Sequence, residues 1–208
     1  PILEPHNEYA HALRDQSITL DVNSLDLPVW LFRFEELLDV IYRGRPAPDG
    51  EADLLRELIP LAKSQFAAYS SMNFGASLLR KQADGLLFSL DAPSPYRMLD
   101  LLALLDEMMG KLDQRHDRYH MRVLKGRLES LVTDARYRFM FGKGATEDNL
   151  ESIIGRIFRI PHDQHRITVL QLAGLPSEVL NAVVSILSRL SFEVAMWSSG
   201  SFEVLLLC

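Results

Sequence analysis

Residues 167–172 read Ile-Thr-Val-Leu-Gln-Leu, and they are followed by the turn Ala173-Gly-Leu-Pro176. A short, β-branched and continuously apolar run of this kind predicts a strand that is buried on both faces. From Ser177 to Trp197, apolar residues recur at the spacing of a helix with one wide buried stripe. Residues 202–208, Phe-Glu-Val-Leu-Leu-Leu-Cys, are again strand-like. The stretch therefore predicts a βαβ unit with parallel strands and a right-handed crossover.

The sequence stops at the last residue of this second predicted strand. Because α/β proteins build their sites in the loops after the carboxyl ends of such strands, we expect the chain to be a fragment of a longer protein. Cys208 is the single cysteine, so an internal disulfide is excluded. We expect it to be a small buried hydrophobe in a reducing, cytoplasmic protein.

The first 24 residues have the same character as the last 40. Ile2-Leu3-Glu4 is typical of the end of a strand, residues 9–14 can form a short helix, and residues 18–22 alternate as a strand does. The sequence between these two parts is helical in pattern. We predict an α/β fold whose core is split into residues 1–24 and 161–208, with about four strands in one parallel sheet, around an all-helical insertion at 25–160.

Composition indicates a globular chain. The 208 residues are 48% hydrophobic, and no basic-then-apolar signal segment opens the sequence. No run approaches the roughly 20 apolar residues that span a bilayer, so no membrane partner is expected. The net charge is −6 but is unevenly distributed: residues 1–110 carry 9 basic and 17 acidic side chains, whereas residues 111–166 carry 12 basic and 8 acidic ones. Only the second block is a candidate surface for an anionic partner.

Four basic residues in that block share one face of a predicted helix: Arg115, Arg118, Arg122 and Lys125. A phosphate backbone could lie along such a face. The face could equally be solvated, or it could contact a neighbouring subunit, and the sequence leaves these three interpretations open.

The histidines give weaker signals. His116 and His120 are four residues apart, with Asp117 beside the first, which is similar to the zincin HExxH arrangement. Aspartate is one methylene shorter than the glutamate of that motif, and no third ligand follows at an obvious spacing. We therefore predict no metal site here, and we expect His162 and His165 to lie in a solvated loop. No GxxxxGK[ST] or GxGxxG phosphate loop occurs in the sequence.

A polar hexapeptide, Glu4-Pro-His-Asn-Glu-Tyr9, follows the first predicted strand. The carboxyl edge of an open parallel sheet is where ligands bind, so Glu4, His6 and Glu8 are candidate site residues. The alternative is a polar loop in which Glu8 helps to start the next helix. Spacing alone does not separate the two.

The same hexapeptide resembles the Asp-Pro-His-x-Glu-Tyr motif of bacterial HerA-like ATPases in the HerA/FtsK superfamily. Residues 136–141, Arg-Tyr-Arg-Phe-Met-Phe, and 172–179, Leu-Ala-Gly-Leu-Pro-Ser-Glu-Val, look like further landmarks of that family in the right order, as do Arg189 and residues 195–198. The resemblance reaches both ends of the chain. It implies that the predicted sheet is part of a RecA-like core.

The resemblance also implies a function. The chain would lie between the Walker A loop, before Pro1, and the Walker B acids, after Cys208, of a P-loop ATPase. The intact parent would use ATP and Mg²⁺, form hexameric rings and move duplex DNA, often with a nuclease partner. The fragment alone is predicted to be inactive and to bind neither cofactor.

The resemblance also implies where individual residues lie in the intact protein. Glu4, which stands where the family has aspartate, would lie with His6 and Glu8 near the nucleotide or its magnesium ion. Gln171 would lie beside the Walker B strand, near the phosphates, or would be a satisfied buried amide. Arg189 is expected to form a structural ion pair and not to act as an arginine finger.

A second class of function remains open. The helical insertion could be an interaction module that docks a partner or a neighbouring subunit, with the α/β layer holding it in place. A third reading, a metallohydrolase built on His116 and His120, would require stoichiometric zinc.

Overall fold

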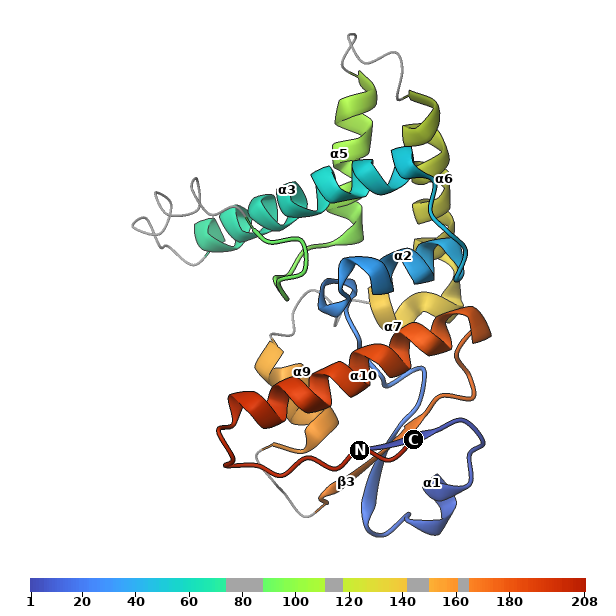
Figure 1. Cartoon of the computed structure of the whole chain (residues 1–208), viewed down its shortest axis with the longest axis vertical. Coiled ribbons are helices and arrows are strands. Elements are labelled where there is room, and N and C mark those ends of the chain that lie inside the picture. The colour runs from blue at the N-terminus through green and yellow to red at the C-terminus, as the bar shows by residue number, and fades with distance from the viewer. Residues whose placement is uncertain (74–87, 111–117, 142–149, 161–164) are drawn as a thin grey trace.

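The structure is a computed structural model of the chain, and it describes residues 1–73, 88–110, 118–141, 150–160 and 165–208. Figure 1 shows a small sheet with its covering helices at one end of the molecule and a group of longer helices at the other. The two chain termini lie close together beside the sheet.

The sheet contains three parallel strands, β1 (Ile2–Glu4), β2 (Ser17–Leu20) and β3 (Ile167–Gln171), in the order β1-β3-β2. β3 is central, and Val169 and Leu170 are fully buried within it. This burial explains its continuous apolar run, because both faces of a central parallel strand are covered. The predicted α/β fold with a parallel sheet, of the kind found in a partial RecA-like core, is confirmed.

The fourth predicted strand, residues 202–208, is reduced to one bridge. Leu207 pairs in parallel with Ile2, and the backbone N–H of Leu3 donates to the carbonyl of Leu207 over 2.8 Å. Leu205 is 71% exposed, and Cys208 is exposed as well. The expectation of a buried strand with a buried cysteine is therefore wrong, because this segment pairs with β1 on one side and only at Leu207.

Helices cover the sheet. α10 (Ser177–Trp197) follows β3 and lies across the sheet, with Val179, Val183 and Ile186 fully buried. α10 is long and apolar enough to cross a bilayer by length and composition, contrary to the expectation from sequence, and 44% of that apolar window is buried inside the protein. The short α1 (Tyr9–Ala12) and α9 (Leu150–Phe158) contact β3.

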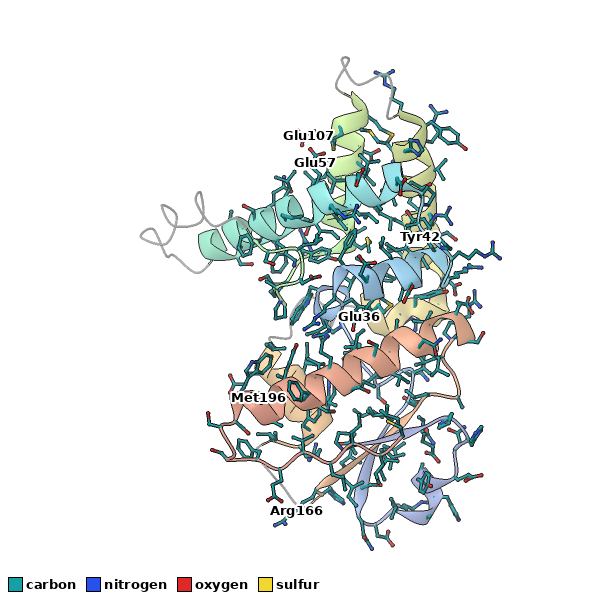
Figure 2. The ribbon with its side chains drawn as sticks, in the orientation of Figure 1. Glu36, Tyr42, Glu57, Glu107, Arg166 and Met196 are labelled. Carbon is teal, nitrogen blue, oxygen red and sulfur yellow. The ribbon has the colours of Figure 1, made fainter. Side chains whose placement is uncertain are left out.

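A network of charges joins α2 (Phe34–Tyr42) to α10. Arg189 of α10 donates to the carbonyl of Leu31, in the 3₁₀ turn η1 (Val29–Leu31), over 2.7 Å, and it pairs with Glu36 at 3.1 Å and with Glu193 at 3.3 Å. Glu36 lies at the contact between the two helices (Figure 2). Because Arg189 is 14% exposed and all these partners belong to the fold, its predicted role as a structural ion pair is confirmed.

The remaining helices form the other end of the molecule. α3 (Asp49–Asn73), α5 (Met98–Gly110) and α6 (Arg118–Thr133) pack against one another, and η2 (Ala135–Tyr137) and α7 (Arg138–Phe141) lead back toward the sheet. Their buried leucines and those of the α/β layer form one continuous hydrophobic core. The division into residues 1–24, 25–160 and 161–208 stays a prediction.

Candidate functional site

Three loops meet at the carboxyl edge of the sheet, because parallel strands end on the same side. Residues 5–8 follow β1, residues 21–24 follow β2 and residues 172–176 follow β3. Gly174 approaches the β2 loop so closely that a Cβ atom there would lie 2.6 Å from Cγ2 of Val22. Glu4 and Gln171 are register partners on adjacent strands, so the structure brings these two candidate site residues together.

Glu4 holds the first of these loops. Its side chain is buried, and its two carboxylate oxygens accept hydrogen bonds from the backbone N–H groups of Tyr9 and Ala10, the first turn of α1. The backbone carbonyl of Glu4 accepts from the N–H of Leu172 over 2.9 Å. Glu4 therefore fixes residues 5–8 between β1 and α1, which makes it a positioning residue in this structure.

His6 and Glu8 are exposed at the loop tip, and Asn7 between them has a left-handed backbone with φ 59°. Asparagine tolerates this conformation better than most residues, so the sequence suits the sharp turn. The structure thus separates the candidate set: Glu4 and Gln171 lie within the sheet edge, whereas His6 and Glu8 face solvent.

Gln171 is not beside the C-terminal segment. β1 lies between β3 and Leu207, so the neighbours of Gln171 are β1 on one side and β2 on the other. The expectation that Gln171 flanks the predicted Walker B strand is wrong, because that segment adds to the sheet at β1. The strand next to the C-terminal segment is β1, and the candidate residue on β1 is Glu4.

Asp21 is an acidic residue at this edge that the sequence reasoning missed. It directly follows Leu20 of β2, which pairs with Leu170 of β3, so Asp21 lies beside Gln171. Glu4 lies beside Gln171 on the other neighbouring strand, β1. Its carboxylate accepts from the hydroxyl of Ser24 over 2.6 Å and from the backbone N–H of Ser24 and Asn23. The Ser24 hydroxyl, followed by the Asn23 and Ser24 donors, lowers the pKa of Asp21. The sequence Asp-Val-Asn-Ser directly after a strand was the available signal.

Two of the carboxylates at this edge already accept hydrogen bonds from the protein in this arrangement. Glu4 is held by two amides and Asp21 by its own turn, and the part of the chain that the structure describes contains no group of three His, Cys, Asp or Glu residues placed to hold a metal. Glu4 and Asp21 thus serve the fold in this arrangement, and a magnesium–nucleotide site at this edge would need ligands from further residues.

The predicted basic face of α6 is not uniform. Lys125 pairs with Asp106 of α5 at 2.5 Å and with Glu129 at 3.6 Å, and the hydrogen bond to Asp106 raises its pKa. Arg118 and Arg122 are exposed, and Arg115 lies outside the described residues. The face therefore offers two solvated arginines beside a lysine that is already neutralised.

The histidine pair is also divided. His116 and His162 lie outside the described residues. The ring of His120 packs against Gly50 in the first turn of α3, where a Cβ atom would lie 3.0 Å from it, and makes an edge contact with Tyr119. His165 precedes β3, and its carbonyl accepts from Nε of Arg159 over 3.3 Å. His120 thus has a packing role.

Among known families, the sequence profile described as "Helicase HerA, central domain" matches residues 2–191. The match begins in β1 and ends within α10, so it includes the hexapeptide, all three strands and the helical part. A search of curated proteins finds no match.

Proposed function

Because the chain belongs to the HerA helicase central-domain family, we propose that it forms part of the motor of a ring-forming ATPase that moves duplex DNA. The family itself establishes an ATPase of the HerA/FtsK type, which uses ATP and Mg²⁺. Hexamer formation, DNA translocation and a nuclease partner are the finer parts of the proposal.

The observation that carries the proposal is the family match across residues 2–191, together with a parallel sheet whose loops converge at one edge. Ligands of open parallel sheets bind at this edge. The Leu207 segment runs parallel to β1, so it points toward the same edge as Glu4. Residues that follow this segment in a longer chain would thus lie near Glu4, and the proposal assigns the Walker B acids to that place.

The residues of this chain would then contribute by holding the loop at the carboxyl edge in place. Glu4 fixes the 5–8 loop, and that loop presents His6 and Glu8 to whatever occupies the carboxyl edge. P-loop ATPases depend on positioning and on charge stabilisation more than on covalent chemistry. The phosphate-binding loop and the magnesium ligands are assigned to residues outside this sequence.

The test is a comparison of two proteins: this chain alone, and a longer chain that includes the residues flanking it. We expect DNA-stimulated ATP hydrolysis from the longer chain and none from residues 1–208 alone. The flanking sequence should contain GxxxxGK[ST] before Pro1 and acidic residues directly after Cys208. Absence of both motifs would refute the assignment, and ATP turnover by the isolated chain would refute the expected inactivity.

A protein contact surface is the second candidate, and one observation favours such a surface on the α/β layer; docking by the helical insertion stays a prediction. Three large apolar side chains on the last turns of α10 are exposed: Phe192 at 68%, Met196 at 64% and Trp197 at 53%. Met196 is labelled near the end of α10 in Figure 2. Such a patch is typical of a protein contact surface, and a neighbouring subunit of a ring would use it without excluding the ATPase proposal.

A further inference from the structure

A cavity of about 530 Å³ lies between the α2–α3 connection and α6, away from the sheet. Its lining includes three arginines, Arg43 and Arg45 from the connection and Arg127 from α6, and two residues with hydroxyls, Tyr42 and Ser130. Apolar side chains, among them Ile41 and Leu131, complete the wall. This volume is in the range of sites for small organic ligands.

The chain reversal after α2 brings two of the arginines to the cavity. Arg43 ends α2 in a left-handed conformation, with φ 55°, and Gly44 continues it with φ 69°. The N–H of Gly44 closes the helix by donating to the carbonyl of Asp39 over 2.8 Å. This turn places Arg43 and Arg45 in the lining of the cavity, which also includes residues of α6.

Arg127 is held in position by two contacts. Its guanidinium lies 4.8 Å from the centre of the Tyr42 ring, and its Nε lies 3.5 Å from Oε2 of the buried Glu51. Glu51 also accepts a hydrogen bond from the Tyr42 hydroxyl over 2.9 Å. Tyr42 is labelled at the end of α2 that faces α6 in Figure 2. Arg127 is therefore pre-organised by the fold.

The charged side chains that line this cavity are all positive. No carboxylate is in the lining, and two ion pairs join its arginines to acidic residues among the described residues: Glu51 with Arg127, and Glu178 with Arg43 at the longer distance of 3.9 Å. The charge of Asp134 also acts on Arg43. Arg45 has no ion-pair partner among the residues that the structure describes, and it is exposed. Three guanidinium groups thus line a space that contains no carboxylate, with Glu51, Glu178 and Asp134 outside the lining.

We propose that this cavity, formed by Arg43, Arg45, Arg127 and Ser130, binds phosphate groups. Arginine presents planar, forked donors that match phosphate oxygens, and several arginines around one space favour a multiply charged tetrahedral anion over a single carboxylate. The phosphates would come either from a nucleic-acid backbone or from a free pyrophosphate or nucleotide. The proposal concerns a surface of the helical part and does not depend on the nucleotide chemistry of the sheet edge.

The test uses inorganic pyrophosphate as the probe, titrated into the purified chain and followed by isothermal titration calorimetry. Arg45→Gln and Arg43→Gln should each weaken binding by up to about fivefold, the range for an exposed ion pair. The double variant should weaken it more than either single variant. Arg166→Gln is the matched control, because Arg166 is also an exposed arginine but lies near the sheet, far from Tyr42 in Figure 2.

A second titration, with duplex DNA at several salt concentrations, identifies the source of the phosphates. If the backbone of DNA occupies the cavity, the double variant should lower the slope of log affinity against log salt by roughly two, about one per lost contact. If a free anion occupies it, only pyrophosphate binding should weaken. Pyrophosphate binding that is absent, unchanged in the double variant, or equally weakened by Arg166→Gln would overturn the proposal.

Discussion

Lys63 is the buried lysine of α3, and its side chain is 3% exposed as part of a largely apolar helix face. Its ammonium donates to the backbone carbonyls of Ser89, Leu90 and Ala92 over 3.0, 2.8 and 2.7 Å. These bonds tie the segment before α5 to α3. Burial lowers the pKa of Lys63 to about 8, partly offset by the charge of Asp91.

This shift predicts a pH dependence of stability. Between about pH 8 and the ordinary lysine value of 10.5, the unfolded chain keeps the proton that the folded chain has lost. The free energy of unfolding should therefore rise with pH for this group. Urea unfolding at pH 7 and pH 9.5 should show the wild type gaining stability relative to Lys63→Met as the pH increases.

Lys125→Met is the control for this measurement. The hydrogen bond to Asp106 raises the pKa of Lys125, so its titration lies above the pH range used. The stability difference between wild type and Lys125→Met should stay constant from pH 7 to pH 9.5. A difference for Lys63→Met that is equally flat would contradict the assigned pKa.

At the residue scale the sequence predicted candidates but not their contacts. The motif identified Glu4, yet only the structure shows its carboxylate turned onto the amides of Tyr9 and Ala10. Asp21 was missed because no motif includes it, and its place beside Gln171 depends on the strand order β1-β3-β2. A linear pattern records residue types, whereas strand order is decided by packing between distant segments.

At the scale of elements, the joint between α2 and α10 depends on Arg189. Removing one member of a buried ion pair leaves the partner charge unpaired, which costs about 3 kcal/mol or more. Arg189→Met should lower the free energy of unfolding by about that amount, measured by urea denaturation, because the Leu31 carbonyl would lose this donor and Glu36 would lose its charged partner, keeping only the neutral donors of Ser185 and the Arg33 backbone.

The same network provides a matched control. Arg33 pairs with Glu193 at 3.1 Å, but its side chain is 52% exposed. Arg33→Met should therefore cost less than about 1 kcal/mol, the range of an exposed pair. Equal effects of the two substitutions would show that the burial of Arg189 does not determine the strength of the joint.

Periodicity predicted some elements well and failed for one. β3 and α10 follow the predicted bounds closely, because a buried strand and a one-sided helix impose their spacing on the sequence. Residues 202–208 are more apolar than β3 but form one bridge. Apolar composition gives the tendency to form a strand, whereas the number of paired neighbours determines whether the strand is buried.

At the scale of the whole molecule, charge is the property that sequence and structure describe most differently. The positive block at residues 111–166 suggested one continuous basic face, but Lys125 pairs with Asp106 and Arg136 pairs with Asp134 at 2.7 Å. Arg118 and Arg122 remain solvated on α6. The net charge of −6 and this local neutralisation favour a protein contact over a DNA contact on that face.

Charge reversal of Arg118 and Arg122 to glutamate tests this inference. A face that lies along DNA phosphates loses at least about two contacts when both arginines are reversed, so the salt slope of DNA affinity would fall by roughly two. We expect the slope to stay unchanged and self-association, measured by light scattering of the purified protein, to weaken. Arg138→Glu, an exposed arginine on α7, should change neither quantity. A reduced slope with unchanged association would instead assign this face to DNA, since only a phosphate contact depends on released counterions in that way.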